Sequence, residues 1–218
     1  MGEGGIKMLP TKVQAILDWP PLTDVSATRS FLGLCNYYRR FVSGDSTIAA
    51  PLFDLLRIDK PFQWTDVEQQ SFDQLKQAMT SAPVLALPDY SKEFYICTDA
   101  SGYGIGGVLC QLYGSVYRPL MFLSHKLTGA ELNWPTHDTE LYAIIYTLKQ
   151  CRPYLDNKRV NIITDHQSLI YIQRQPKLTA KQARWNAYLA NIDCHLLYQP
   201  GKNNVLADAL SRRADHNK

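Results

Sequence analysis

The sequence lacks the features that identify several common classes of protein. Its five cysteines are odd in number and show no spacing typical of zinc ligands, which argues against a disulfide-linked secreted domain and against a zinc finger. No apolar run approaches the roughly eighteen residues that span a bilayer, and the first residues contain no signal-peptide core. Internal repeats and low-complexity tracts are also missing. These absences favour an intracellular globular protein whose cysteines stay reduced.

Hydrophobic residues make up 45% of the 218 residues, enough for one large or two small packed domains. Charge is unevenly distributed along the chain. Residues 1–90 hold eight basic against ten acidic side chains, a net charge of −2, whereas residues 91–218 hold fifteen against ten, a net charge of +5. The basic part suits a polyanionic ligand, and a solvated basic surface is the simpler alternative.

Four carboxylates stand inside apolar segments, where acidic residues are uncommon unless they are paired. They are Asp99 in YICTDAS, Glu140 in DTELYAII, Asp165 in NIITDHQS and Asp208 in VLADALS. Magnesium prefers oxygen ligands, and two such ions need several carboxylates to offset their charge. The four acids therefore predict a metal site of the two-ion kind that nucleases use.

Two of these acids follow strand-like runs. Residues 94–97 and 160–163 are short apolar runs, and both are followed by Thr-Asp. Such runs are typical of central strands that are covered on both faces. Because open α/β sheets place their ligands at the carboxyl ends of strands, we expect Asp99 and Asp165 to be neighbours.

The other two acids stand in helical patterns. The apolar residues between 141 and 148 recur at helical spacing, and Glu140 precedes this stripe by one position. Asn203 or Asn204 can cap a short last helix that carries Asp208. Each carboxylate thus has a regular element to hold it.

The rest of the chain divides near residue 90. Residues 1–90 are predicted to be mostly helical, with helices over 27–38 and from a capping box at Thr65–Glu68 to about Thr80. The segment from Pro83 to Lys92 is the expected domain boundary. Later elements are predicted as strands over 94–99, 105–112, 116–123, 160–164 and 194–199, and as helices over 137–151, 168–173 and 180–190.

Several longer motifs resemble one known family. The chain resembles the thumb and ribonuclease H portion of the Pol polyprotein of gypsy-type LTR retrotransposons. The motifs that carry this resemblance are RSFLGLCNYYRRF at residues 29–41, AAPL at 49–52, FQW at 62–64, SAPVL at 81–85, TDAS at 98–101, TDHQS at 164–168 and YQPG at 198–201. The resemblance extends over almost the whole sequence.

The resemblance implies a fold and an activity. The implied fold is an α/β ribonuclease H-like domain over residues 91–212, with a mixed five-stranded sheet flanked by helices. A mostly helical thumb-like domain over residues 1–90 precedes it, and residues 213–218 are expected to be a disordered tail. The implied activity is hydrolysis of the RNA strand of an RNA/DNA hybrid by an endonuclease. Asp99, Glu140, Asp165 and Asp208 match the family's metal-binding carboxylates, which hold two Mg²⁺ ions or Mn²⁺ as a substitute.

The same resemblance suggests which residues contact nucleic acid. Arg39 and Arg40 are candidates for binding phosphates without reading sequence. Contacts to 2′-hydroxyl groups across the wide minor groove of the hybrid would select RNA. The candidates for these contacts are Ser101, Gly102, Thr136, His137 and Gln167.

The chain also departs from the family pattern. No two aspartates are adjacent, so the Tyr-x-Asp-Asp motif of polymerases is missing and we expect no polymerase activity. Many relatives have a histidine in the loop before the last aspartate, and residues 200–204 contain none. Asp45 replaces a residue that is usually apolar, which we expect to loosen the thumb or weaken its grip on nucleic acid.

Three other interpretations remain open. The glycines from Gly102 to Gly107 satisfy G-x-G-x-x-G, but the strand-like residues that follow favour a hairpin over a dinucleotide site. The chain could be a non-catalytic nucleic-acid-binding or protein-interaction module derived from a retroelement. It could also be an assembly fragment that forms a homodimer or joins other Pol domains. The expected location is the cytoplasm or nucleus, or a virus-like particle.

Overall fold

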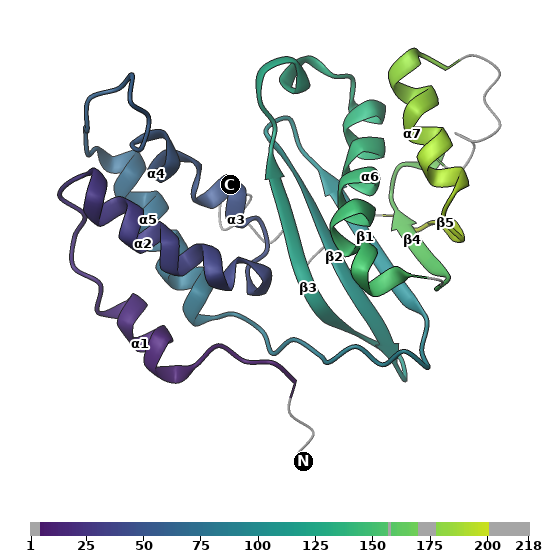
Figure 1. The fold of residues 1–218 in the computed structure, drawn as a ribbon, viewed down its shortest axis with the longest axis horizontal. Helices are drawn as coiled ribbons and strands as arrows, with labels where there is room; N and C mark the ends of the chain where they lie inside the picture. The colour runs from purple at the N-terminus through teal and green to yellow at the C-terminus, as the bar shows by residue number, and fades with distance from the viewer. Residues whose placement is uncertain (1–4, 157, 170–177, 201–218) are drawn as a thin grey trace.

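The computed structural model describes residues 5–156, 158–169 and 178–200. Helices occupy its N-terminal part and a sheet with two long helices occupies the rest (Figure 1). The N-terminal elements are α1 (Pro10–Leu17), α2 (Val25–Tyr38), the 3-10 turn η1 (Arg39–Phe41), α3 (Asp45–Ile48), α4 (Ala50–Asp54) and α5 (Asp66–Thr80). None of the helices in the described ranges is long and apolar enough to cross a membrane.

The second part is a mixed sheet of five strands. Its elements are β1 (Phe94–Ala100), β2 (Gly104–Tyr113), β3 (Val116–Lys126), the 3-10 turn η2 (Gly129–Asn133), α6 (Thr136–Leu155), β4 (Val160–Thr164), α7 (Ala180–Ala190) and β5 (Cys194–Tyr198). The strand order is β3-β2-β1-β4-β5. The first three strands form an antiparallel meander, and β4 and β5 run parallel to β1. The mixed five-stranded sheet and the meander are confirmed.

Helices cover both faces of this sheet. On one face, apolar residues of α6 such as Ile144 and Leu148 form a buried cluster with Ile96 and Ile162 of the central strands. The opposite face joins a second cluster that the N-terminal helices dominate. That cluster includes Phe31, Leu52, Leu75, Cys97, Val108, Cys110, Phe122 and Ile163. The prediction of central strands buried on both faces is therefore confirmed.

The hydrophobic core continues across the predicted domain boundary. Since Leu75 of α5 and Ile163 of β4 belong to one cluster, the two parts share buried surface. The domain boundary near residue 90 therefore stays a prediction. The proposed tail at 213–218, the short helix with Asp208 and most of the helix at 168–173 lie outside the described residues.

Local capping signals place the helix starts. Thr65 and Glu68 form a capping box at the start of α5, with the Thr65 backbone N–H donating to Glu68 Oε2 at 2.9 Å. Thr179 and Gln182 form another at the start of α7. The predicted capping box at residue 65 and the helix ending at residue 80 are confirmed, as is the helix over 180–190.

The helical part docks on the edge strand β3 through polar contacts. The Ser46 backbone N–H donates to Ser124 Oγ, and the Ser46 hydroxyl donates to the Ser124 carbonyl, each at 2.9 Å. Asp45, the preceding residue, has only 8% of its surface exposed. Burial raises the pKa of Asp45 to about 6, although Arg39 opposes the rise. A carboxylate in this place is costly to ionise. That Asp45 loosens the helical part or weakens its grip on nucleic acid stays a prediction.

The glycine-rich segment makes a hairpin between β1 and β2. A strand and not a helix follows it, so the dinucleotide interpretation is wrong. Gly107 serves close packing instead, because a Cβ at this position would collide with the side chain of Thr147 on α6. The absence of a side chain lets α6 approach the sheet.

Two glycine substitutions should have opposite effects on stability. Gly107→Ala should lower the free energy of unfolding by about 1–3 kcal/mol, because the new methyl group overlaps Thr147. Gly33→Ala is the matched control: Gly33 lies inside α2 with nothing near its missing Cβ, so alanine should raise stability by about 0.5–1 kcal/mol. Urea unfolding of the two variants measures both. Thr147→Ala should recover part of the loss in the Gly107→Ala protein, and no recovery would contradict the collision.

Candidate active site

The pairing of β1 with β4 brings two of the predicted acids together. Cys97 of β1 is the parallel partner of Ile163 of β4. Asp99 lies two residues beyond Cys97, and Asp165 lies two residues beyond Ile163, immediately after the last residue of β4. The two carboxylates therefore stand side by side at the carboxyl ends of adjacent parallel strands. Their charges interact, and Asp165 raises the pKa of Asp99.

Glu140 comes to the same place from α6. It is the fifth residue of that helix, and only 5% of its surface is exposed. Burial raises the pKa of both Asp99 and Glu140, and a hydrogen bond from the backbone N–H of Ala100, at the end of β1, to each carboxyl group opposes this rise. Glu140 Oε2 is buried and has no hydrogen-bond partner. The acids of α6 and β1 thus share one hydrogen-bond donor, the backbone N–H of Ala100.

The carboxyl group of Glu140 is the most strongly perturbed of the three. Burial is the largest cause, followed by the charges of Asp165 and Asp99, and together they raise its pKa to about 8. Burial, then Asp165, also raises the pKa of Asp99. Three acids near one another in a partly buried place repel each other unless protons or a cation neutralise them.

These features fit a divalent cation in part. A cation would offset the repulsion and satisfy the unpaired Oε2 of Glu140, and carboxylate oxygens are the donors that Mg²⁺ prefers. Within the described residues, however, no group of three or more His, Cys, Asp or Glu side chains is arranged to hold a metal ion. The fourth predicted ligand, Asp208, lies outside these residues.

The residues predicted to contact the minor groove are all exposed near this site. Ser101 and Gly102 follow β1, Gln167 follows β4, and Thr136 and His137 open α6. The Ser101 hydroxyl also has a structural role, because it donates to the Gly104 carbonyl at 3.0 Å and closes the hairpin turn. The fold therefore gathers these five positions around the carboxyl ends of β1 and β4.

Arg39 and Arg40 lie in η1, beside β3. Both are exposed, and Arg39 Nη1 donates to Asn36 Oδ1 at 3.4 Å. The positive charge of Arg39 also lowers the pKa of Tyr146 on α6, although burial raises that pKa overall. The helical part therefore presents a cation close to Tyr146, whose hydroxyl donates to the Ser124 carbonyl of β3.

Sequence reasoning missed Asp138, two positions before Glu140. Its carboxylate is buried and bound by Lys181 and Gln182 of α7. An acid in a first helical turn is ordinarily interpreted as a surface residue that favours the helix dipole. No local signal reveals partners more than forty positions away in the chain.

Sequence comparison relates the chain to retrotransposon polyproteins. It is 38% identical over 220 residues to the "Retrovirus-related Pol polyprotein from transposon opus" of Drosophila melanogaster, covering 95% of this chain and 22% of that protein. It is 36% identical over 226 residues to the corresponding gypsy polyprotein of the same organism, covering 98% and 21%. The Tf2-3 transposon polyprotein of Schizosaccharomyces pombe is 36% identical over 220 residues, covering 99% and 16%. The chain spans about a fifth of the length of these curated relatives.

Comparisons with a protein family and with solved structures agree with this relationship to Pol polyproteins. Residues 64–162 match the family described as "RNase H-like domain found in reverse transcriptase". A foamy viral protease-reverse transcriptase in complex with double-stranded DNA superposes with a TM-score of 0.78 at 20% identity, over 89% of this chain and 35% of that one. Its counterpart with an RNA/DNA hybrid gives a TM-score of 0.74 at 20% identity, over 91% and 28%. These likenesses show the fold.

The fold and the matched segment define a ribonuclease H-like domain. The chain is a homologue of part of the Pol polyproteins of retrotransposons such as gypsy, as its motifs predicted.

Removing the charge of Glu140 should change how stability depends on pH. The folded pKa is about 8 against an ordinary value of 4.5, so the folded protein keeps a proton that the unfolded chain loses over this range. The free energy of unfolding should therefore fall as pH rises from 4.5 to 8. Glu140→Gln removes the part of this dependence that Glu140 contributes, and its melting temperature without divalent ions should exceed that of the wild type most at pH 8. If the melting temperatures of the variant and the wild type differ as much at pH 4 as at pH 8, Glu140 ionises normally.

Proposed function

We propose that this chain is a metal-dependent endoribonuclease that cuts the RNA strand of RNA/DNA hybrids. The observation that carries the proposal is the convergence of Asp99, Glu140 and Asp165 from three different elements. Burial and their mutual repulsion together raise the pKa of Glu140, which is the electrostatic signature of a site built for cations. Homology to Pol polyproteins over most of the chain supports the same activity.

The four predicted carboxylates would hold two Mg²⁺ ions, for which Mn²⁺ can substitute. Asp99 would contribute to holding both ions, Glu140 and Asp165 to holding one of them, and Asp208, which lies outside the described residues, to holding the other. When bound, such ions lower the pKa of an attacking water and stabilise the leaving 3′ oxygen of the RNA strand. The protein's own part is to hold the carboxylates rigidly on β1, α6 and β4.

Selection of the hybrid would depend on the exposed residues around the carboxylates. Thr136 and His137 at the start of α6, and Ser101, Gly102 and Gln167 after the strands, present polar groups toward the substrate. An A-form minor groove is wide and shallow, so these groups could reach 2′-hydroxyls on the RNA strand. A structural relative is described in complex with an RNA/DNA hybrid, which supports this class of substrate.

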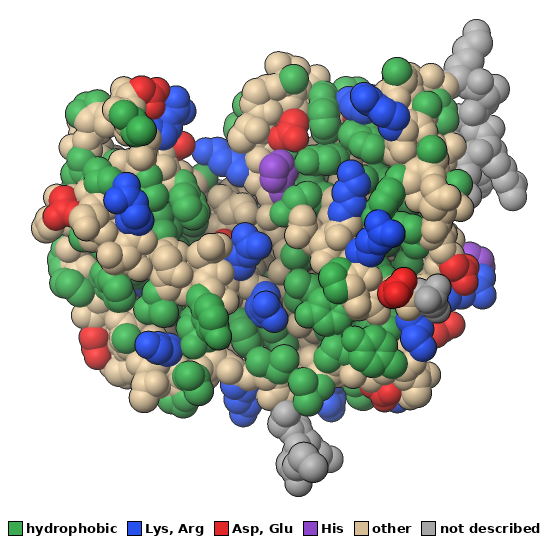
Figure 2. Space-filling model, viewed as in Figure 1, with side chains coloured by type: hydrophobic (Ala, Val, Ile, Leu, Met, Phe, Trp, Pro, Cys, Tyr) green, Lys and Arg blue, Asp and Glu red, His purple; other side chains and the backbone are tan. Residues whose placement is uncertain are grey.

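Basic residues would supply much of the grip. Figure 2 shows Lys and Arg side chains spread over the face that carries α6 and α7. Arg39 and Arg40 add positive charge from the helical part. Phosphate contacts of this kind orient a duplex without reading its sequence. The chain has no adjacent aspartates, so we propose that it extends no primer.

A second candidate is a module that binds nucleic acid without cutting it. The observation that favours it is that the side chains in the described ranges form no ready-made group of metal ligands. A structural relative described in complex with double-stranded DNA is compatible with binding alone. Binding without cleavage in Mg²⁺ or Mn²⁺ would establish this candidate.

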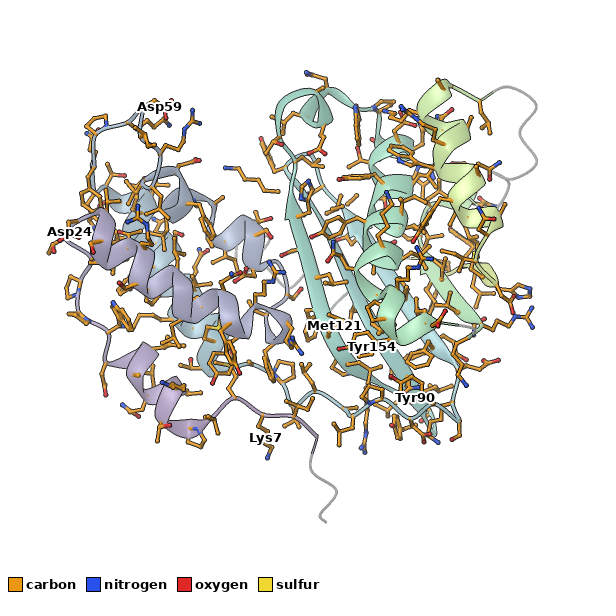
Figure 3. All side chains as sticks on the ribbon, viewed as in Figure 1. Lys7, Asp24, Asp59, Tyr90, Met121 and Tyr154 are labelled. Atoms are coloured by element: carbon orange, nitrogen blue, oxygen red, sulfur yellow. The ribbon has the colours of Figure 1, made fainter. Side chains whose placement is uncertain are left out.

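Substitution of the acids tests the nuclease directly. Asp99→Asn and Glu140→Gln should each reduce cleavage of a labelled hybrid in Mg²⁺ by at least about a thousandfold, because an amide loses both charge and donor strength. Binding of the hybrid should persist. The matched control is Asp59→Asn, in an exposed ion pair of Arg57 far from the sheet (Figure 3), and it should cleave normally. Hybrid cleavage at the wild-type rate by a verified Asp99→Asn protein would contradict the mechanism.

The role of the arginine pair can be read from salt dependence. If Arg39 and Arg40 each neutralise one phosphate, replacing both by alanine should reduce the slope of log affinity against log salt concentration by about two at most. Arg57→Ala is the matched control, since this exposed arginine already pairs with Asp59 at 2.8 Å. Fluorescence anisotropy with a labelled hybrid at several salt concentrations measures the slopes. Equal slopes for the wild type and the double variant would show that Arg39 and Arg40 neutralise no phosphates.

A further inference from the structure

Asp138 is a buried acid in the first turn of α6, with 4% of its surface exposed. Lys181 Nζ lies 2.8 Å from its Oδ2, and Gln182 Nε2 donates to its Oδ1 at 2.7 Å. His137 Nε2 lies 3.4 Å from the same Oδ1. These contacts of the Asp138 carboxylate hold α7 against the start of α6.

The two α7 donors are themselves fixed. Lys181 Nζ lies 3.9 Å from the ring centroid of Trp134 and 5.3 Å from that of Trp185. Gln182 Oε1 accepts from the backbone N–H of Thr179 at 3.0 Å, so the capping box orients the amide that binds Asp138. The two tryptophan rings pack with centroids 5.4 Å apart. We call Asp138, Lys181 and Gln182 the α6–α7 clamp.

The clamp holds a part of α6 that the core does not. From Leu141 onward the helix is anchored by its buried apolar stripe, and Glu140 is anchored by the Ala100 backbone N–H. Thr136 and His137, one turn earlier, are exposed, and neither belongs to the buried apolar clusters. His137 contacts the neighbouring acid, which in turn is bound to α7.

We propose that Asp138 is a positioning residue: through the α6–α7 clamp it holds His137 in place for gripping the hybrid. This inference rests on the proposed function. The clamp acts on affinity and leaves the reaction itself nearly unchanged, because Glu140 has its own anchors. A merely structural ion pair would stabilise the fold without linking substrate affinity to His137.

The first measurement is steady-state cleavage by the full chain carrying Asp138→Asn. The amide keeps the size of the side chain but loses the charge that binds Lys181. We expect KM for the hybrid to rise about tenfold while kcat stays within about twofold, the pattern for an interaction made equally in the ground and transition states. Asp59→Asn is the matched control, because it also removes one carboxylate from an ion pair, at 2.8 Å, and should leave both constants unchanged.

The second measurement tests the link to His137. In a His137→Ala background, Asp138→Asn should raise KM by less than about twofold, because the residue that it positions is already gone. A full tenfold effect in that background would mean that the clamp is only structural, and the proposal would fail. A fall in kcat with unchanged KM would also overturn it.

Further measurements distinguish a failure of the clamp from a folding defect and from a failure of the proposed nuclease. If Asp138→Asn does not unfold cooperatively, Lys181→Met replaces it, since methionine keeps an apolar stem over Trp134 and removes the charge. If the wild type cleaves nothing, the proposed nuclease fails, and the clamp is judged on hybrid affinity in metal-free buffer. A roughly tenfold weaker affinity that disappears in the His137→Ala background would support the clamp even then, and an unchanged affinity would refute it.

Discussion

The parallel pairing of β1 with β4 is the constraint on which the rest of the structure depends. It places the carboxyl ends of two buried strands at one edge, so the acids that follow them, Asp99 and Asp165, stand together. β1 and its other neighbour β2 form the floor on which α6 packs, which brings Glu140 over the same edge. A shift of one residue in this register would turn Asp99 to the opposite face of the sheet.

Burial perturbs the pKa of the acids at the site and makes their ionisation unfavourable. The same packing that holds Glu140 rigid removes it from water and sets it beside two other acids, so its pKa rises to about 8. This arrangement opposes folding at neutral pH unless protons or cations neutralise it. Such a cost is typical of a functional site, and the surrounding core offsets it by closing both faces of the sheet.

The helical part and the sheet are coupled by one core and by polar contacts at β3. Leu75 of α5 lies in the same cluster as Ile163, next to the strand end that positions Asp165. Ser46 and Ser124 fix α3 on the edge strand, and Arg39 in η1, which also contacts β3, lies close to Tyr146 of α6. The residues proposed to grip nucleic acid and the residues proposed to cut it are thus held by one continuous packing arrangement.

The sequence by itself determined the local elements and the identity of the candidate acids. The capping box at Thr65 and the apolar runs before Asp99 and Asp165 depend only on near neighbours in the chain, so they could be predicted, and motif resemblance supplied the sheet that joins them. Only the tertiary structure decided that Asp138 meets Lys181, that Gly107 makes room for Thr147, and that burial perturbs the pKa of Glu140. Each of these depends on side chains that are distant in sequence and become neighbours when the helices pack on the sheet, and no local pattern encodes such distances.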